Sequence, residues 1–182
     1  LNQVVTDCLG TSDYMNLIAL HHDVHLKTDL DLNLMPMCGS KIHLHRIVIN
    51  LIMAAMDTMP NGGTITVMTY HSHLYAPLQG YEEISKGDYA VPAISNSGGG
   101  VSWKHIKHIF EPFYMSKQMK TSGSGVELAV VWGVVKDHNG YVDVHSEKDR
   151  GITFRLYFPV MKNDLPEVTL KMIASTNESI DQ

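Results

Sequence analysis

The stretch RIVINLIMAAMDTMPNGGTITVMTY (residues 46–70) predicts a helix, a sharp turn and a strand in direct succession. Apolar residues recur at intervals of three and four, which predicts one buried face of a helix over 41–59. They are Ile47, Val48, Leu51, Ile52, Ala55 and Met59. Ser40 suits the N-cap, and the run from Pro60 to Gly63 ends the helix and turns the chain. The alternation of apolar residues with threonines in TITVMTY is typical of a strand.

Weaker patterns surround this stretch. Residues 12–20 predict a helix with Ser12 as its N-cap, residues 25–32 a half-buried strand, and residues 1–9 either a strand or a helix. Toward the C-terminus we expect a polar loop or hairpin at 71–88, a buried strand at 89–95, a glycine turn at 95–102, a short helix at 103–110, a loop at 111–125, a helix at 126–138, and strands at 141–146 and 153–159. Pro92 lacks an N–H donor, so its strand is expected at a sheet edge or at a bulge. Together these elements indicate a mixed sheet covered by helices, an α/β sandwich.

Composition narrows the class of protein. Of the 182 residues, 44% are hydrophobic and 18% charged, enough to bury a core, and the net charge of -5 argues against a nucleic-acid-binding surface. No apolar run approaches the roughly 18 residues that span a bilayer. Two cysteines cannot make a disulfide framework, so we expect a reducing cytoplasm. One domain is expected over 1–161, with a tail or linker at 162–182.

Eleven histidines raise the question of a metal site. His21, His22 and His25 could share a helix face, and pairs stand at 43/45 and 71/73. These groups lie on separate segments, which favours scattered surface histidines over convergent metal ligands. We read Trp103 and Trp132 as packing residues.

Four segments, taken in their order along the chain, resemble the motifs of a known protein family. They are RIVINLIMAAMDTMPNGG (46–63), AISNSGGGV (93–101), IFEPFY (109–114) and GSGVELA (123–129). With the last two strands they resemble the ATP-binding catalytic domain of sensor histidine kinases, part of the superfamily that includes gyrase, the Hsp90 chaperones and MutL. The resemblance covers roughly residues 1–160. It implies a Bergerat-type two-layer sandwich, with a mixed, mainly antiparallel sheet covered on one face by helices.

The resemblance also implies ATP or ADP with Mg²⁺ as cofactors. It implies two partners, a histidine-bearing dimerisation hairpin that accepts the phosphoryl group and a receiver domain. In the first motif Asn50 matches the family, whereas Ala54 stands where a second asparagine would ligate Mg²⁺. A methyl group cannot ligate a hard cation. Asp57, one helical turn further on, offers a substitute oxygen, although the family usually has an acidic residue there as well.

In the second motif Asn96 takes the place of the aspartate that accepts a hydrogen bond from adenine. Its amide oxygen can still accept that bond, without the charge. Gly98 and Gly100 match the glycines of the family. In the third, Phe110, Pro112 and Phe113 would anchor a nucleotide lid, in which Lys117 and Lys120 either meet phosphates or are solvated.

The fourth motif places Gly123 and Gly125 before a helix, but Glu127 stands where the family has glycine. Helix N-termini attract anions, so the Glu127 carboxylate would compete with phosphate. These departures favour a degenerate, non-catalytic module over a weak nucleotide binder or a competent kinase domain. We expect a monomer, because similar kinases dimerise through the hairpin.

Overall fold

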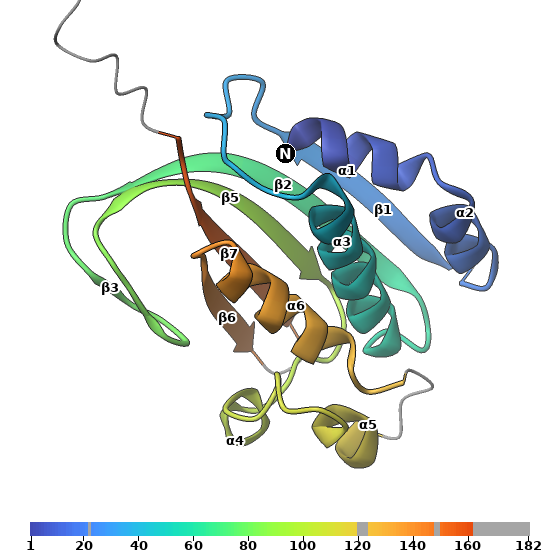
Figure 1. The fold of residues 1–182 in the computed structure, drawn as a ribbon. Coiled ribbons are helices and arrows are strands. Elements are labelled where there is room, and N and C mark those ends of the chain that lie inside the picture. Colours follow the sequence, from blue (N-terminus) through green and yellow to red (C-terminus); the bar gives the residue numbers. More distant parts are fainter. Residues whose placement is uncertain (22, 120–123, 148–149, 162–182) are drawn as a thin grey trace, which may run out of the picture.

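The computed structural model describes residues 1–21, 23–119, 124–147 and 150–161. Five strands form one sheet in the order β1-β2-β5-β7-β6 (Figure 1). Their bounds are Val24–Leu30 for β1, Gly63–Leu74 for β2, Gly87–Asn96 for β5, Tyr141–Glu147 for β6 and Gly151–Pro159 for β7. β1 pairs parallel with β2 and every other pair is antiparallel, so the sheet is mixed and mainly antiparallel, as the sequence predicts.

Helices cover one face of this sheet (Figure 1). The longest are α3 (Lys41–Asp57) and α6 (Glu127–Asp137), which pack against each other, while α1 (Asn2–Leu9) packs on the other side of α3. The 8-residue helix α2 (Ser12–Ala19) follows α1. Two short helices, α4 (Trp103–Ile106) and α5 (Tyr114–Met119), lie beyond the end of β5.

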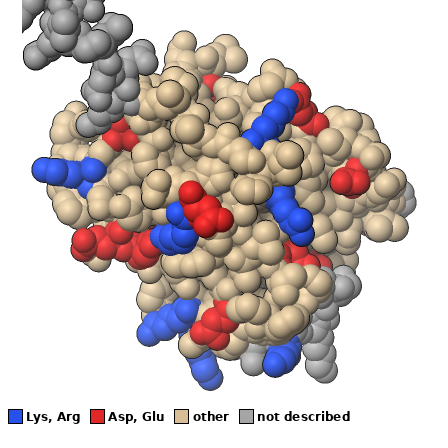
Figure 2. Space-filling model, viewed as in Figure 1, with Lys and Arg blue, Asp and Glu red and all other residues tan. Residues whose placement is uncertain are grey.

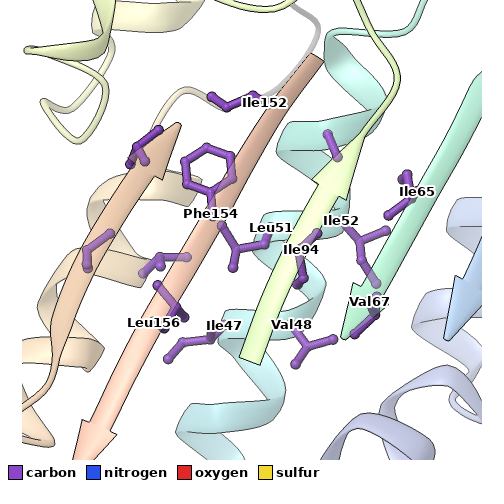
Figure 3. Packing of buried hydrophobic residues seen from close by; sticks show 14 of the residues in the cluster. Ile47, Val48, Leu51, Ile52, Ile65, Val67, Ile94, Ile152, Phe154 and Leu156 are labelled. Atoms are coloured by element: carbon purple, nitrogen blue, oxygen red, sulfur yellow. The ribbon is translucent and has the colours of Figure 1, made fainter. Parts of the chain in front are cut away.

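The core lies between α3 and the sheet. Figure 3 shows the α3 side chains directed at apolar residues of the facing strands. Ile47, Val48, Leu51 and Ile52 of α3 are nearly inaccessible, as are Ile65 of β2 and Leu156 of β7. The apolar residues spaced three and four apart in 46–70 therefore form one buried face of a long helix, as predicted.

Helix starts and lengths differ in detail from the predictions. The Ser40 hydroxyl accepts a hydrogen bond from His43 N at 3.4 Å and caps α3 as expected. At α2 the cap is Thr11, whose hydroxyl accepts from Tyr14 N at 3.3 Å, so the prediction of Ser12 was wrong by one residue. Residues 2–9 are helical, α4 ends at Ile106 rather than at 110, and α5 lies in the segment expected to be loop.

Two expectations about single residues were wrong. Pro92 lies in β5, the central strand, and the register of β5 with β7 is the same on both sides of it, so it is neither at an edge nor at a bulge. It pairs with Thr69 of β2, while the β5–β7 pairing is interrupted between Ala90 and Ala93, where the proline has no N–H to offer. Trp103 is 61% exposed and is therefore not a packing residue, whereas Trp132 packs against the core as expected.

The expected hairpin at 71–88 is present and its tip wraps round the β6 edge. It carries two short strands, β3 (Leu78–Gln79) and β4 (Glu83–Ile84). The Glu82 carboxylate accepts from Val142 N at 2.7 Å and from Lys136 Nζ at 2.5 Å. The hairpin thus satisfies a donor on the outer edge of β6 and joins that strand to α6.

Charged side chains of both signs are interspersed on the helix-covered face (Figure 2). None of the described helices is long and apolar enough to cross a membrane. Within the described ranges, no group of three or more His, Cys, Asp or Glu residues is placed to hold a metal ion.

Candidate functional site

A cavity of about 50 Å³ lies where the C-terminal half of α3 meets the start of α6 and the start of β7. Nine of its twelve lining residues come from the four segments that the sequence singled out, and Met115, Ile152 and Phe154 lie outside them. The twelve are Ala54, Asp57, Thr58, Val101, Ile109, Glu111, Met115, Gly125, Glu127, Leu128, Ile152 and Phe154. Of the predicted site residues, the fold therefore brings Ala54, Asp57, Gly125 and Glu127 together around one space.

Glu127 uses its carboxylate to bind the turn that precedes its own helix. Oε1 accepts hydrogen bonds from Ser124 N at 2.8 Å and Ser124 Oγ at 2.7 Å, and Oε2 accepts from Gly125 N at 2.9 Å. Burial alone would raise the pKa of this carboxyl, but the hydrogen bonds from Ser124 and from the backbone outweigh it and lower the pKa. The side chain is therefore an anion held by two backbone N–H groups at a helix N-terminus.

Asn96, at the end of β5, turns its amide into the protein and is 6% exposed. Its Oδ1 accepts from Ile152 N at 2.9 Å, and its Nδ2 donates to Ala55 O at 3.1 Å and to Thr58 Oγ1. The amide thus ties the end of α3 to the start of β7, and it does not line the cavity.

Asn50 lies two turns before the end of α3 and is also buried. Its Nδ2 donates to the backbone oxygen of Glu127 at 3.1 Å, which fastens α3 to the first residue of α6. Ala54, one turn further on, presents only a methyl group to the cavity, and Asp57 is the residue of α3 that brings a carboxylate there.

The glycine turn after β5 fits closely against its neighbours. Gly100 has φ +69°, and a Cβ placed on it would lie 2.2 Å from Glu147 O; a Cβ on Gly98 would lie 2.6 Å from Thr58 O. The Ser146 hydroxyl holds the turn, accepting from Val101 N at 2.7 Å and donating to Gly151 O at 2.9 Å. Ser146 was not among the predicted residues, because a serine in an alternating strand gives no local signal.

The structure shows the surroundings of two residues that were expected to anchor a lid. Phe110 is buried in the core, and Phe113 has φ +64° and donates its N–H to Gly125 O at 2.7 Å. Lys117 is exposed on α5 and is not among the cavity residues. Lys120 and Gly123 lie outside the described residues.

The chemistry available in the cavity is limited. Its charged lining residues are all carboxylates, from Asp57, Glu111 and Glu127. Oxygen ligands do suit Mg²⁺. However, the position expected to ligate it is a methyl group, both oxygens of Glu127 already accept hydrogen bonds from Ser124 and Gly125, and no metal-holding group is found in the described part of the chain. The residues present do not fit a bound Mg²⁺.

Comparison with known proteins gives a family match. The family of histidine kinase-, DNA gyrase B- and HSP90-like ATPases matches residues 39–162. Among curated proteins, the sensor kinase CckA of Brucella abortus is 30% identical over 156 residues, and sporulation kinase E of Bacillus subtilis is 26% identical over 163 residues. These alignments cover 85% and 90% of this chain but only 16% and 20% of the relatives, so the chain spans about a fifth or less of their length.

Solved structures show the same fold. The mycobacterial sensor histidine kinase MprB aligns with a TM-score of 0.62 at 23% identity, over 88% of this chain and 95% of that one. A nucleotide-free catalytic domain of histidine kinase ThkA aligns with a TM-score of 0.66 at 18% identity, over 88% and 92% of the two chains. At these identities the likeness concerns the fold, the two-layer sandwich that the sequence predicts.

Proposed function

The chain belongs to the family of histidine kinase-, DNA gyrase B- and HSP90-like ATPases, and we propose that it is a sensor-kinase ATP-binding domain in which Mg-ATP binding and phosphotransfer are impaired. The observation that carries the proposal is the Glu127 carboxylate on the N–H groups of Ser124 and Gly125. Backbone donors of this kind, before a helix, are the groups that bind phosphate in glycine-rich turns. Here a side chain of the protein already occupies them.

The negative charge of Glu127 disfavours the binding of a phosphate nearby. Two unit charges about 4 Å apart repel by roughly 1 kcal/mol in water and roughly 4 kcal/mol at an effective dielectric constant of 20. The lower value already weakens binding about fivefold. A phosphate would also have to replace the hydrogen bonds that Ser124 and Gly125 now make.

The two asparagines support the same proposal. The Asn96 amide is engaged by Ala55, Thr58 and Ile152, so reading a base would require it to share or exchange those bonds. Asn50 donates a hydrogen bond from its side-chain amide to the backbone oxygen of Glu127. Both side chains therefore make hydrogen bonds that connect elements of the fold. Ala54 has no oxygen that could ligate a metal.

A domain of this kind acts by docking rather than by catalysis. We propose a cytoplasmic interaction module, monomeric as an isolated domain, that contacts a histidine-bearing hairpin or a receiver domain. The alternative is a competent domain that phosphorylates a histidine on a separate hairpin.

Calorimetric titration of the chain with ATP and with ADP, each with and without Mg²⁺, tests the proposal. We expect no binding heat at millimolar nucleotide for the wild type and measurable binding for Glu127→Gly and Glu127→Gln. Glu83→Gln, at an exposed residue of β4, is the matched control for loss of one negative charge and should behave as the wild type. Tight, Mg²⁺-dependent ATP binding by the wild type would restore the competent-kinase alternative.

A further inference from the structure

The two edges of the sheet differ in how they are covered. At the β6 edge lies the 71–88 hairpin, whose Glu82 carboxylate accepts a hydrogen bond from Val142 N at 2.7 Å. At the opposite edge lies β1 (Figure 1), which pairs with β2 and with no other strand of the described chain. An edge strand that is not covered is a template on which another strand can pair.

The bonds at the two ends of β1 fix which of its residues face β2. Gly63 N donates to Asp23 O at 3.0 Å, and Asp31 N donates to Thr69 O at 3.1 Å, both in the parallel register of β1 with β2. Along a strand, alternate residues direct their backbone groups to the same side. The odd-numbered residues from 23 to 31 therefore bond to β2.

The even-numbered residues of β1 direct their backbone groups to the outer edge. They are Leu26, Thr28 and Leu30, and no hydrogen bond from the described residues reaches their N–H or C=O groups. Thr28 is exposed, and both leucines are half-buried on the side of the sheet that the helices cover. This edge thus offers donors and acceptors in the alternating order that a further strand requires.

The sequence along this edge is complementary to its own reverse. Residues 26 to 30 are in turn apolar, basic, neutral, acidic and apolar, LKTDL. Lys27 and Asp29 are both exposed, and neither makes an ion pair within the part of the chain that the structure describes. When two such strands run antiparallel about Thr28, leucine lies opposite leucine and Lys27 lies opposite Asp29.

We propose that β1 pairs antiparallel with β1 of a second copy of this chain, about a two-fold axis at Thr28. Leu26, Thr28 and Leu30 then form the hydrogen-bonded pairs. Lys27 and Asp29 fall at non-hydrogen-bonded positions, where opposite Cα atoms are only about 4.5 Å apart and side chains lie closest. Moving the axis by one residue would place Lys27 opposite Lys27 or Asp29 opposite Asp29, and like charges in that position are destabilising. The charges therefore select one register.

The small size of the interface makes the pairing weak. One 7-residue strand from each copy covers less than the roughly 800 Å² per partner that stable complexes bury. The chain is therefore monomeric at micromolar concentration, as proposed above, and associates only toward millimolar concentration or where two copies are held together. The pairing goes beyond the proposed function and does not depend on nucleotide.

Sedimentation equilibrium of the chain from micromolar to millimolar concentration, with charge-swapped variants, tests the proposal. Lys27→Asp and Asp29→Lys each place like charges opposite one another, and each should weaken self-association at least about tenfold. The double variant should associate as the wild type does. Lys86→Asp, at an exposed residue outside β1, is the matched control and should also associate as the wild type does.

A mixture of the two single variants gives the sharpest comparison. One copy then has acids at both positions and the other has lysines at both, so the equimolar mixture should associate more tightly than either variant alone. Thr28→Pro removes an N–H that faces outward, at an edge where proline is tolerated, and should abolish association.

Three results would overturn the proposal. The first is a wild type that stays monomeric up to millimolar concentration. The second is single variants that associate as strongly as the wild type, since another surface would then mediate contact. The third is a mixture that associates no better than its components, and this comparison holds even where the double variant folds poorly. Circular dichroism of each single variant confirms that it is folded. Nucleotide titration is a separate measurement, so none of these results bears on the proposed function.

Discussion

Replacing Asn96 by aspartate, the residue expected there in similar kinases, should destabilise the domain rather than repair it. The Asn96 side chain donates from Nδ2 to Ala55 O and to Thr58 Oγ1 and accepts at Oδ1 from Ile152 N. An aspartate keeps the bond from Ile152 but has no hydrogen to donate. Its second oxygen would lie against the Ala55 carbonyl, at a position where the nitrogen is now 3.1 Å away.

The size of the effect follows from the bonds lost. Two hydrogen bonds contribute about 1 kcal/mol each, and a buried charge adds a desolvation cost. Thr58 can rotate to donate to the carboxylate and recover part of this. We therefore expect a loss of about 2 kcal/mol at neutral pH, which lowers the midpoint of thermal unfolding by about 4–8 °C in a domain of this size.

Urea unfolding, followed by circular dichroism at pH 7.5 and at mildly acidic pH, measures this. The deficit of Asn96→Asp should shrink on acidification, because burial favours the protonated acid, which again has a hydrogen to donate. Asn61→Asp, in the exposed turn after α3, is the matched control and should change stability by less than about 0.5 kcal/mol. An Asn96→Asp variant as stable as the wild type would show that the amide does not hold α3 to β7, and would leave Asn96 available to a base.

Three further predictions concern the glycine turn, the thiols and Glu127. Gly100→Ala should lose at least about 2 kcal/mol in urea unfolding, because its φ is +69° and the Cβ meets Glu147 O, whereas Gly99→Ala, with nothing within 4 Å, should be nearly neutral. A thiol reagent at pH 8 should label one cysteine quickly, the exposed Cys38, since burial raises the pKa of the Cys8 thiol to about 11; equal labelling of both in the folded protein would contradict this. Because the pKa of Glu127 is lowered in the folded protein, its contribution to stability is present above the pKa of the unfolded chain and is lost as pH falls through the pKa of the folded protein. The stability of Glu127→Gln should therefore fall less than that of the wild type between pH 6 and pH 3.

Local sequence patterns predict helices and strands well where the regular spacing of apolar residues within one segment determines its secondary structure. The apolar spacing of α3 and the alternation in β2 are properties of short segments, and both elements lie where expected. Pro92 shows the limit of such reasoning. A missing donor argues for an edge, but the pairing of β5 with β7 skips the proline locally, so the strand can still be central. Trp103 shows the same limit, because a tryptophan does not reveal whether its helix packs on the core.

Four of the predicted site residues, Ala54, Asp57, Gly125 and Glu127, line the cavity, but the sequence did not predict the hydrogen bonds at the site. Glu127 could be suspected as a built-in anion because its partners, Ser124 and Gly125, are three and two residues away in sequence. The Asn96 bonds span 41 and 56 residues, and no local pattern carries them. For the same reason Ser146, which joins the glycine turn to β6 and β7, was missed.

Three polar side chains at or beside the candidate site make hydrogen bonds that stabilise the protein without a ligand. Asn50 binds the start of α6, Asn96 joins α3 to β7, and Glu127 closes the turn before its helix. A nucleotide would have to exchange contacts that contribute about 0.5–1.5 kcal/mol each, and more for the charged ones, before gaining any of its own. Stabilisation by a ligand follows its concentration relative to its dissociation constant. If ATP binds no more tightly than millimolar, 1 mM ATP adds at most about 0.4 kcal/mol to the stability of the domain. These three side chains are thus held by the protein's own hydrogen bonds, which is the arrangement that the proposed docking module requires.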